Sequence, residues 1–237
     1  DYYAAFMDQA GIDQRGLAPL QPAFDKINAI ANGTDLARVL GEGLRADVDP
    51  LNATNYATEQ LFGLFVAQGL EDPQHNMAYL LQGGLGMPNR DYYLSTDPAM
   101  VAIRDKYKAY VAALLKQANV ADAEAKAAGI YALEEKIAKA QSSIVETEDV
   151  HKANNPWPVA DFARKAPGLD WPTYFQAAGL ADQQAIDAWQ PGAIAKLSAL
   201  TKSESLQTWK DWLTFHAINR DTAVAASGMR RYGLVQP

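Results

Sequence analysis

Apolar residues recur at helical spacing along most of the chain, and this pattern predicts a series of short amphipathic helices. Between Leu36 and Leu44 the leucines repeat every fourth position, and Thr34 or Asp35 is the expected N-cap of that helix. Similar spacing, with glycine, proline or asparagine at the breaks, predicts further helices near residues 3–10, 20–31, 98–118, 130–144, 158–162, 170–179, 185–189, 194–200 and 203–217.

Two short apolar runs interrupt the helical pattern. The runs Leu61–Gln68 and Met77–Gln82 contain aromatic and β-branched residues and flank a polar turn at Pro73. Bounded runs of this kind are typical of paired strands. We therefore expect a mainly α, multi-helix domain over residues 1–222 with one small β-hairpin near 61–82, followed by a divergent tail or engineered junction over 223–237.

A loop with unusually specific chemistry follows the second run. Its sequence is Gly83-Gly84-Leu85-Gly86-Met87-Pro88-Asn89-Arg90-Asp91-Tyr92-Tyr93-Leu94. Glycine and proline at this density exclude a regular helix or strand. Asp97 and Pro98 then provide an N-cap and a first-turn proline for the next helix.

Composition narrows the class of protein. The chain has 237 residues, a net charge of −7 and no cysteine, so it is expected to be soluble and globular, without disulfides or cysteine-ligated metals. Lysine and arginine are scattered, which excludes a nucleic-acid surface, and no apolar run approaches the roughly 20 residues of a membrane span. The sequence begins at Asp1 without a methionine, and Tyr3, Phe6 and Met7 already follow helical spacing, so we expect a segment of a longer protein.

Candidate catalytic chemistry is sparse. The three histidines, His75, His151 and His216, are too far apart to share one helical zinc motif. We expect His75 and His151 to be exposed and His216 to be a hydrogen-bonded core or boundary residue. Glu134 and Glu135 point about 100° apart on a helix and are expected to be solvated charges. No catalytic and no metal-binding residue is assigned.

The glycine loop resembles a known signature. It is similar to the Gly-Leu-Gly-Leu-Pro-x-Arg-Asp-Tyr-Tyr sequence of the neprilysin-like family of zinc metallopeptidases, with Met87 and Asn89 as substitutions. Segments that resemble the family less specifically occur in the same order at Met7–Gly16, Glu134–Ala138 and Trp209–His216. The resemblance covers about residues 1–226 and part of the family's N-terminal half.

The resemblance implies a function for the parent protein. In this family that half forms most of a helical lid domain, which faces the catalytic domain across a water-filled cavity and admits small peptides. It implies zinc in the parent enzyme but none in this chain, which lacks His-Glu-x-x-His. The implied partners are the catalytic C-terminal half of the same protein and short peptides. The implied localisation is extracytoplasmic, and the absence of cysteine suggests a bacterial periplasm.

Four loop residues are candidates for the cavity wall or for substrate access: Arg90, Asp91, Tyr92 and Tyr93. Arg90 has the chemistry to bind a peptide carboxylate. A structural role, in which Arg90 and Asp91 pair and pin the loop to the next helix, is favoured at this point. Two other functions stay open: a stand-alone helical module that binds a peptide or protein without cleaving it, and a purely structural domain.

Overall fold

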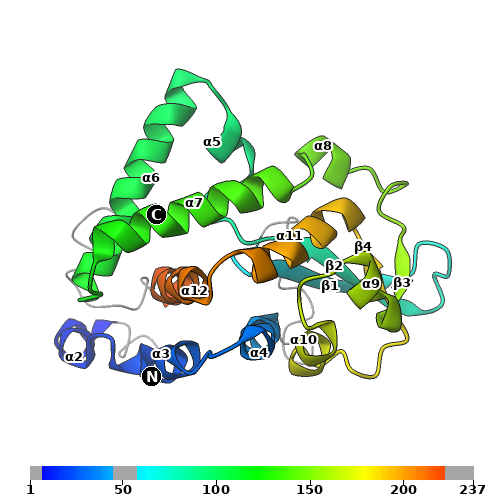
Figure 1. The fold of residues 1–237 in the computed structure, drawn as a ribbon, viewed down its shortest axis with the longest axis horizontal. Helices are drawn as coiled ribbons and strands as arrows, with labels where there is room; N and C mark the ends of the chain where they lie inside the picture. The colour runs from blue at the N-terminus through cyan, green and yellow to red at the C-terminus, as the bar shows by residue number, and fades with distance from the viewer. Residues whose placement is uncertain (1–6, 45–57, 222–237) are drawn as a thin grey trace.

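The computed structural model describes residues 7–44 and 58–221, and within these ranges the fold is mainly α (Figure 1). The helices are α2 (Gln9–Arg15), η1 (Ala18–Leu20), α3 (Gln21–Asn28), α4 (Gly33–Leu44), α5 (Asp91–Leu94), α6 (Pro98–Gln117), α7 (Ala123–Ala140), α8 (Ile144–Thr147), η3 (Val159–Asp161), α9 (Phe162–Lys165), α10 (Trp171–Ala177), α11 (Pro191–Ser203) and α12 (Leu206–Asp221). The strands are β1 (Phe62–Gln68), β2 (Asn76–Gln82), β3 (Pro156–Pro158) and β4 (Ala185–Ala188). The predicted tail over 223–237 lies outside the described residues, so that boundary stays a prediction.

The predicted hairpin is confirmed, but it is part of a larger sheet. β1 and β2 pair antiparallel, with Phe62 opposite Gln82. β4 then pairs parallel with β2, and β3 pairs antiparallel with β4, so the order is β1-β2-β4-β3. The prediction of a single hairpin was therefore incomplete.

Two segments that were predicted to be helical overlap the strands β3 and β4 instead. Residues 185–189 were expected to be helical, but Ile186 and Ala188 are buried in β4, where neighbouring strands satisfy the backbone. Pro158, expected at the start of a helix near 158–162, lies with Pro156 and Trp157 in β3. β3 is an edge strand in this sheet, and an edge is where a strand tolerates proline, since its missing N–H need not enter the ladder.

Two helix starts also differ from expectation by a few residues. At α4 the Asn32 side chain accepts a hydrogen bond from the Asp35 N–H (2.9 Å), so Asn32 and neither Thr34 nor Asp35 is the N-cap. At the start of α12 the Ser205 hydroxyl accepts a bond from the third residue beyond it, whereas Ser203 ends α11. Asparagine and serine are both preferred caps, so the sequence offered several close competitors.

The helices enclose one main hydrophobic core. Figure 1 shows α7 crossing the molecule above α11 and α12, with α3, α4 and α10 in a row below them and the sheet at one end. Trp171, Trp209 and Trp212 are fully buried in this core. Ile103 of α6 lies outside this core and is 38% exposed. No helix in the described part of the chain is long and apolar enough to cross a membrane.

Candidate functional site

The glycine loop between β2 and α5 requires glycine at two positions for different reasons. Gly84 has a φ of +94°, a left-handed conformation that favours glycine. At Gly86 an added Cβ would lie 2.0 Å from Oη of Tyr107. The loop backbone therefore approaches the helices behind it more closely than a side chain would allow.

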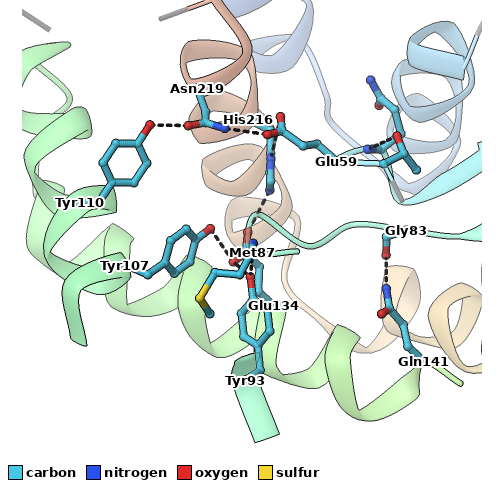
Figure 2. Close-up of polar contacts among 12 residues, drawn as sticks. Glu59, Gly83, Met87, Tyr93, Tyr107, Tyr110, Glu134, Gln141, His216 and Asn219 are labelled. Atoms are coloured by element: carbon cyan, nitrogen blue, oxygen red, sulfur yellow. Dashed lines mark hydrogen bonds and ion pairs between the residues drawn. The ribbon is translucent and has the colours of Figure 1, made fainter. Parts of the chain in front are cut away.

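Behind this loop lies a buried carboxylate, Glu134 of α7, which is 0% exposed (Figure 2). Its Oε2 accepts hydrogen bonds from the hydroxyls of Tyr93 (2.8 Å) and Tyr107 (2.7 Å). Its Oε1 lies 2.9 Å from Nε2 of His216. The Met87 N–H donates to the Tyr93 hydroxyl (3.0 Å), which joins the loop backbone to this group. We call Tyr93, Tyr107, Glu134 and His216 the charged cluster; the expectation that Glu134 is a solvated helix charge was wrong.

The charged cluster continues to the segment before β1. Nδ1 of His216 lies 3.5 Å from Oε2 of Glu59, an ion pair longer than a good hydrogen bond. The Asn219 side chain donates to Oε1 of Glu59 (2.7 Å) and accepts from the Tyr110 hydroxyl. α12 thus holds Glu59 at two points one turn apart, as Figure 2 shows.

The protonation states follow from these contacts. Burial by itself lowers the pKa of His216, but the interactions with Glu134 and Glu59 outweigh it and raise that pKa to about 9. His216 is therefore an imidazolium at neutral pH. Burial and the charge of Glu134 hold the pKa of Tyr93 and of Tyr107 well above the usual range, so both hydroxyls stay protonated and donate.

A second polar cluster, without charge, fastens the other end of the loop. The Gln141 side chain donates to the Gly83 carbonyl (2.9 Å). The Thr147 hydroxyl accepts from Nε2 of Gln82 (3.5 Å) and of Gln190 (3.3 Å). The Gln82 N–H donates to Oε1 of Gln190 (3.0 Å), linking β2 to the residue that precedes α11. We call Gln82, Gln141, Thr147 and Gln190 the amide cluster.

A cavity of about 420 Å³ is lined by the glycine loop and by three residues of the amide cluster, Gln82, Gln141 and Thr147. Residues 85–90 of the loop line one side of it, and residues 141–148 contribute to another. The charged side chains in the lining are Glu59, Arg90 and Glu148. The site therefore has a wall of loop backbone, which Glu134 and its partners stabilise from behind, and charges of both signs in its lining.

The four predicted access residues occupy different environments. Arg90 lines the cavity, Asp91 is exposed, Tyr92 is half-buried and Tyr93 belongs to the charged cluster. Within the described part of the chain Arg90 and Asp91 form no ion pair, and the buried Nε of Arg90 has no hydrogen-bond partner. The pairing assumed in the structural interpretation is thus not found.

Other groups hold the loop to α6. The Arg104 guanidinium donates to the carbonyls of Ser95 (2.7 Å) and Tyr92 (3.3 Å). Asp97 caps α6 as predicted, accepting from the Ala99 N–H at 2.7 Å. The loop, α5 and the start of α6 are therefore fixed by Met87 before the predicted Arg-Asp pair and by Asp97 and Arg104 after it.

The histidines lie where the sequence predicted, and they do not suit zinc. His75 is exposed beside Asp72 at 2.7 Å, His151 is exposed, and His216 is buried and hydrogen-bonded. A zinc ligand must be a neutral imidazole, whereas His216 is charged and has both ring nitrogens directed at carboxylates. Residues 7–44 and 58–221 contain no group of three or more side chains that could hold a metal ion.

Comparison with known proteins agrees with this architecture. The model of peptidase family M13 matches residues 1–231. Neprilysin-3 of Drosophila melanogaster is 22% identical over 97% of this chain and 31% of its own length. Endothelin-converting enzyme 1 of Cavia porcellus is 27% identical over 40% of the chain.

Two solved structures have the same fold. The Mycobacterium tuberculosis zinc metalloprotease Zmp1, in complex with an inhibitor, has a TM-score of 0.85 at 23% identity, over 97% of this chain and 34% of Zmp1. PepO from Lactobacillus rhamnosis has a TM-score of 0.65 at 18% identity, over 96% of this chain and 35% of PepO. The chain spans about a third of the length of neprilysin-3 and of both solved proteins.

Proposed function

The chain belongs to peptidase family M13, and from this membership we propose that it forms one wall of the cavity in which a zinc peptidase of the family cleaves small peptides. The match of the family model to residues 1–231 is the observation that supports the proposal most strongly. The chain itself is homologous to the N-terminal region of neprilysin-like zinc metallopeptidases.

The catalytic residues are assigned to the rest of the parent protein. The sequence contains no His-Glu-x-x-His, in which two imidazoles bind the metal and the glutamate acts as general base. Zinc, its ligands and the base therefore belong to the C-terminal part, which is the proposed partner of this chain. This chain contributes the helical wall and the cavity that the glycine loop lines.

Small-peptide selectivity is the finer part of the proposal. The glycine loop is held from behind at Met87 and at Gly83, so the wall does not yield easily to a large substrate. A peptide in extended form fits into a narrow enclosed space, whereas a folded protein does not. We assign the restriction to this rigid wall.

Arg90 is the access residue whose position favours contact with substrate. It lines the cavity and lacks an ion-pair partner among the described residues, so its guanidinium is available to a carboxylate. In the full-length enzyme, Arg90→Ala is expected to raise KM for peptides about tenfold. The matched control is Arg164→Ala. Arg164 is an exposed arginine of α9 that pairs with Asp161, and its removal is expected to leave KM unchanged.

The proposal is tested on the full-length protein. We expect stoichiometric zinc by elemental analysis and hydrolysis of short peptides that a chelator abolishes and added zinc restores. A folded protein that carries the same cleavable sequence in a surface loop should be cleaved far more slowly than the free peptide. Peptide binding without hydrolysis by the zinc-loaded protein would contradict the proposal and favour a binding module.

The proposed location of the parent protein is outside the cytoplasm, in a bacterial periplasm. The resemblance to the neprilysin-like family implies a location outside the cytoplasm, and the absence of cysteine favours a bacterial protein. Cell fractionation with antibodies against residues 58–221 tests it. Recovery in the cytoplasmic fraction would contradict it.

A further inference from the structure

A second cavity, of about 580 Å³, lies on the side of α12 that faces α3 and α4. Figure 1 shows these two helices below α12 and α7 above it. We call this space the α12 cavity. Apolar side chains from all three helices line it, among them Ile27, Val39 and Leu213, and residues 58–60 contribute to the lining. A cavity of this size, with an apolar wall and a limited number of polar groups, is typical of sites for small molecules.

The indole of Trp212 lines the α12 cavity, is 1% exposed and has no hydrogen-bond acceptor among the described residues. Three other tryptophans show the ordinary arrangement: the indole N–H groups of Trp171, Trp189 and Trp209 each donate to a backbone carbonyl. A buried indole N–H normally has such a partner, because leaving it without one costs about 1–3 kcal/mol. The exception at Trp212 therefore indicates that a group in the cavity accepts this hydrogen bond.

Two further polar groups lie beside this indole. The ring of His216 is one turn further along α12, and its centroid is 4.4 Å from that of Trp212. In the described part of the chain the buried Nδ1 of His216 makes no hydrogen bond, since Oε2 of Glu59 is 3.5 Å away. Glu59 accepts from Asn219 through its other oxygen, Oε1. The cavity therefore presents two N–H donors and, next to them, a carboxylate oxygen.

The charges around the α12 cavity are balanced. Figure 2 shows His216 between two carboxylates, Glu59 and Glu134. With the other charged residues of the lining, the cations are Lys26, His216 and Arg220, and the carboxylates are Glu42, Glu59 and Glu134. A neutral ligand keeps this balance. An anion would be repelled by Glu59, and a cation by the imidazolium of His216.

We propose that the α12 cavity binds a small neutral amide that has an apolar body. The amide oxygen accepts a hydrogen bond from the Trp212 indole, the amide N–H donates to Oε2 of Glu59, and the apolar body packs against Ile27 and Leu213. An amide carries an acceptor and a donor on adjacent atoms without a net charge, which is the combination that this cavity lacks.

This site is separate from the proposed peptidase function. The α12 cavity shares only Thr58 and Glu59 with the cavity that the glycine loop lines. Binding of the amide requires neither zinc nor cleavage of a peptide bond. It can therefore be measured with a chelator present, and its outcome does not depend on whether the parent protein is a peptidase.

Fluorine NMR of the full-length protein, labelled with 5-fluorotryptophan, tests the proposal. The probe is 3-methylbutanamide, and Trp212→Phe identifies the resonance of Trp212. We expect the amide to shift this resonance in a saturable manner, and its isosteric anion, 3-methylbutanoate, to bind about tenfold more weakly. No shift of the Trp212 resonance would mean that water alone occupies the cavity and would overturn the proposal. Equal affinity for the amide and the carboxylate would also overturn it.

Substitutions test the two hydrogen bonds separately. Trp212→Phe removes the donor and should weaken binding of 3-methylbutanamide about fivefold. The matched control is Trp189→Phe, which removes an indole that donates to the Thr147 carbonyl outside the α12 cavity and should leave the affinity unchanged. Equal losses in the two variants would contradict the assignment.

A second variant keeps the proposal falsifiable if Trp212→Phe does not fold. Glu59→Gln changes a side chain that is 39% exposed and removes the charge that opposes an anion. It should abolish the preference for the amide over 3-methylbutanoate, measured by calorimetric titration. A preference that persists in Glu59→Gln would overturn the proposed contact with Glu59.

Discussion

Two polar clusters fasten the two ends of one loop, and they do so with different chemistry. The charged cluster holds the loop at Met87 through a tyrosine, a buried carboxylate and an imidazolium. The amide cluster holds it at Gly83 with neutral side chains only. The amide cluster lines the cavity in part, whereas the charged cluster lies behind the loop and outside the cavity lining. Charged and neutral side chains can therefore both hold the loop in place. The two clusters should differ in how strongly pH, or the loss of one interacting side chain, affects their stability.

The charged cluster should be the more fragile of the two. Removing one member of a buried ion pair leaves the other charge buried and uncompensated, whereas a neutral cluster loses only a hydrogen bond. The charged arrangement also makes loop stability depend on the protonation of His216. Three substitutions and the pH dependence of stability test this difference.

Glu134→Gln should destabilise the chain most. The substitution keeps the volume but leaves the buried His216 imidazolium with only its longer contact to Glu59, at a cost of about 3–5 kcal/mol in the free energy of unfolding. Urea denaturation at neutral pH measures it. The control is Glu135→Gln, which loses only an exposed pair with Lys139 and should cost less than about 0.5 kcal/mol. If the two variants lost the same free energy of unfolding, burial of the Glu134 carboxylate would not explain the destabilisation.

Stability should fall as the pH rises from 6.5 towards 9. The pKa of His216 is raised in the folded state from 6.5 to about 9, so the folded chain holds this proton more tightly than the unfolded chain. The stabilisation is fully present below pH 6.5 and is lost as the pH rises through about 9. The total loss is on the order of 3 kcal/mol. A His216→Gln variant should show a flatter profile, and an unchanged slope would contradict the assignment.

Gly86→Ala should cost about 1–3 kcal/mol because its Cβ would overlap the Tyr107 hydroxyl, which is held by Glu134. Gly129→Ala is the matched control: nothing lies within 4 Å of its added Cβ, and it occupies the interior of α7. There the alanine is expected to be neutral or stabilising. Thermal unfolding of both variants distinguishes a close approach from a general effect of the added methyl group.

Thr147→Val should have the smallest effect of the four, about 1–2 kcal/mol. The substitution keeps the shape but removes the acceptor of the Gln190 amide and one of the acceptors of Gln82. Because no group in the amide cluster titrates, the slope of stability against pH should match that of the unchanged chain. A changed slope would show that the two clusters are not independent.

The sequence predicts the local elements well and the long-range ones poorly. The β1–β2 hairpin and the Asp97 cap depend on neighbouring residues, and both are confirmed. β4 was missed because four residues, Ala185–Ala188, become a strand only by pairing with β2 and β3, which lie far away along the chain. Local propensity carries no information on such a partner.

In the site, too, the local feature was predicted and the long-range contacts were not. The glycine loop was recognisable from its sequence, but the burial of Glu134 was not, since its hydrogen-bond partners come from α5, α6 and α12. One signal was available: Glu134 lies four residues after Ile130 and three before Ile137, on the apolar face of α7. The position of Glu134 in that apolar stripe predicts that its side chain is buried. Glu135 lies outside the stripe, so its position does not predict burial.

The difference between the two clusters depends most on the charge of His216, which nitrogen NMR of the imidazole measures directly. The chain contains only three histidines, and a His216→Gln variant assigns the resonance. We expect an imidazolium protonated at both ring nitrogens at neutral pH, titrating near pH 9. A neutral ring at pH 7, or a titration at or below the ordinary value of 6.5, would contradict it.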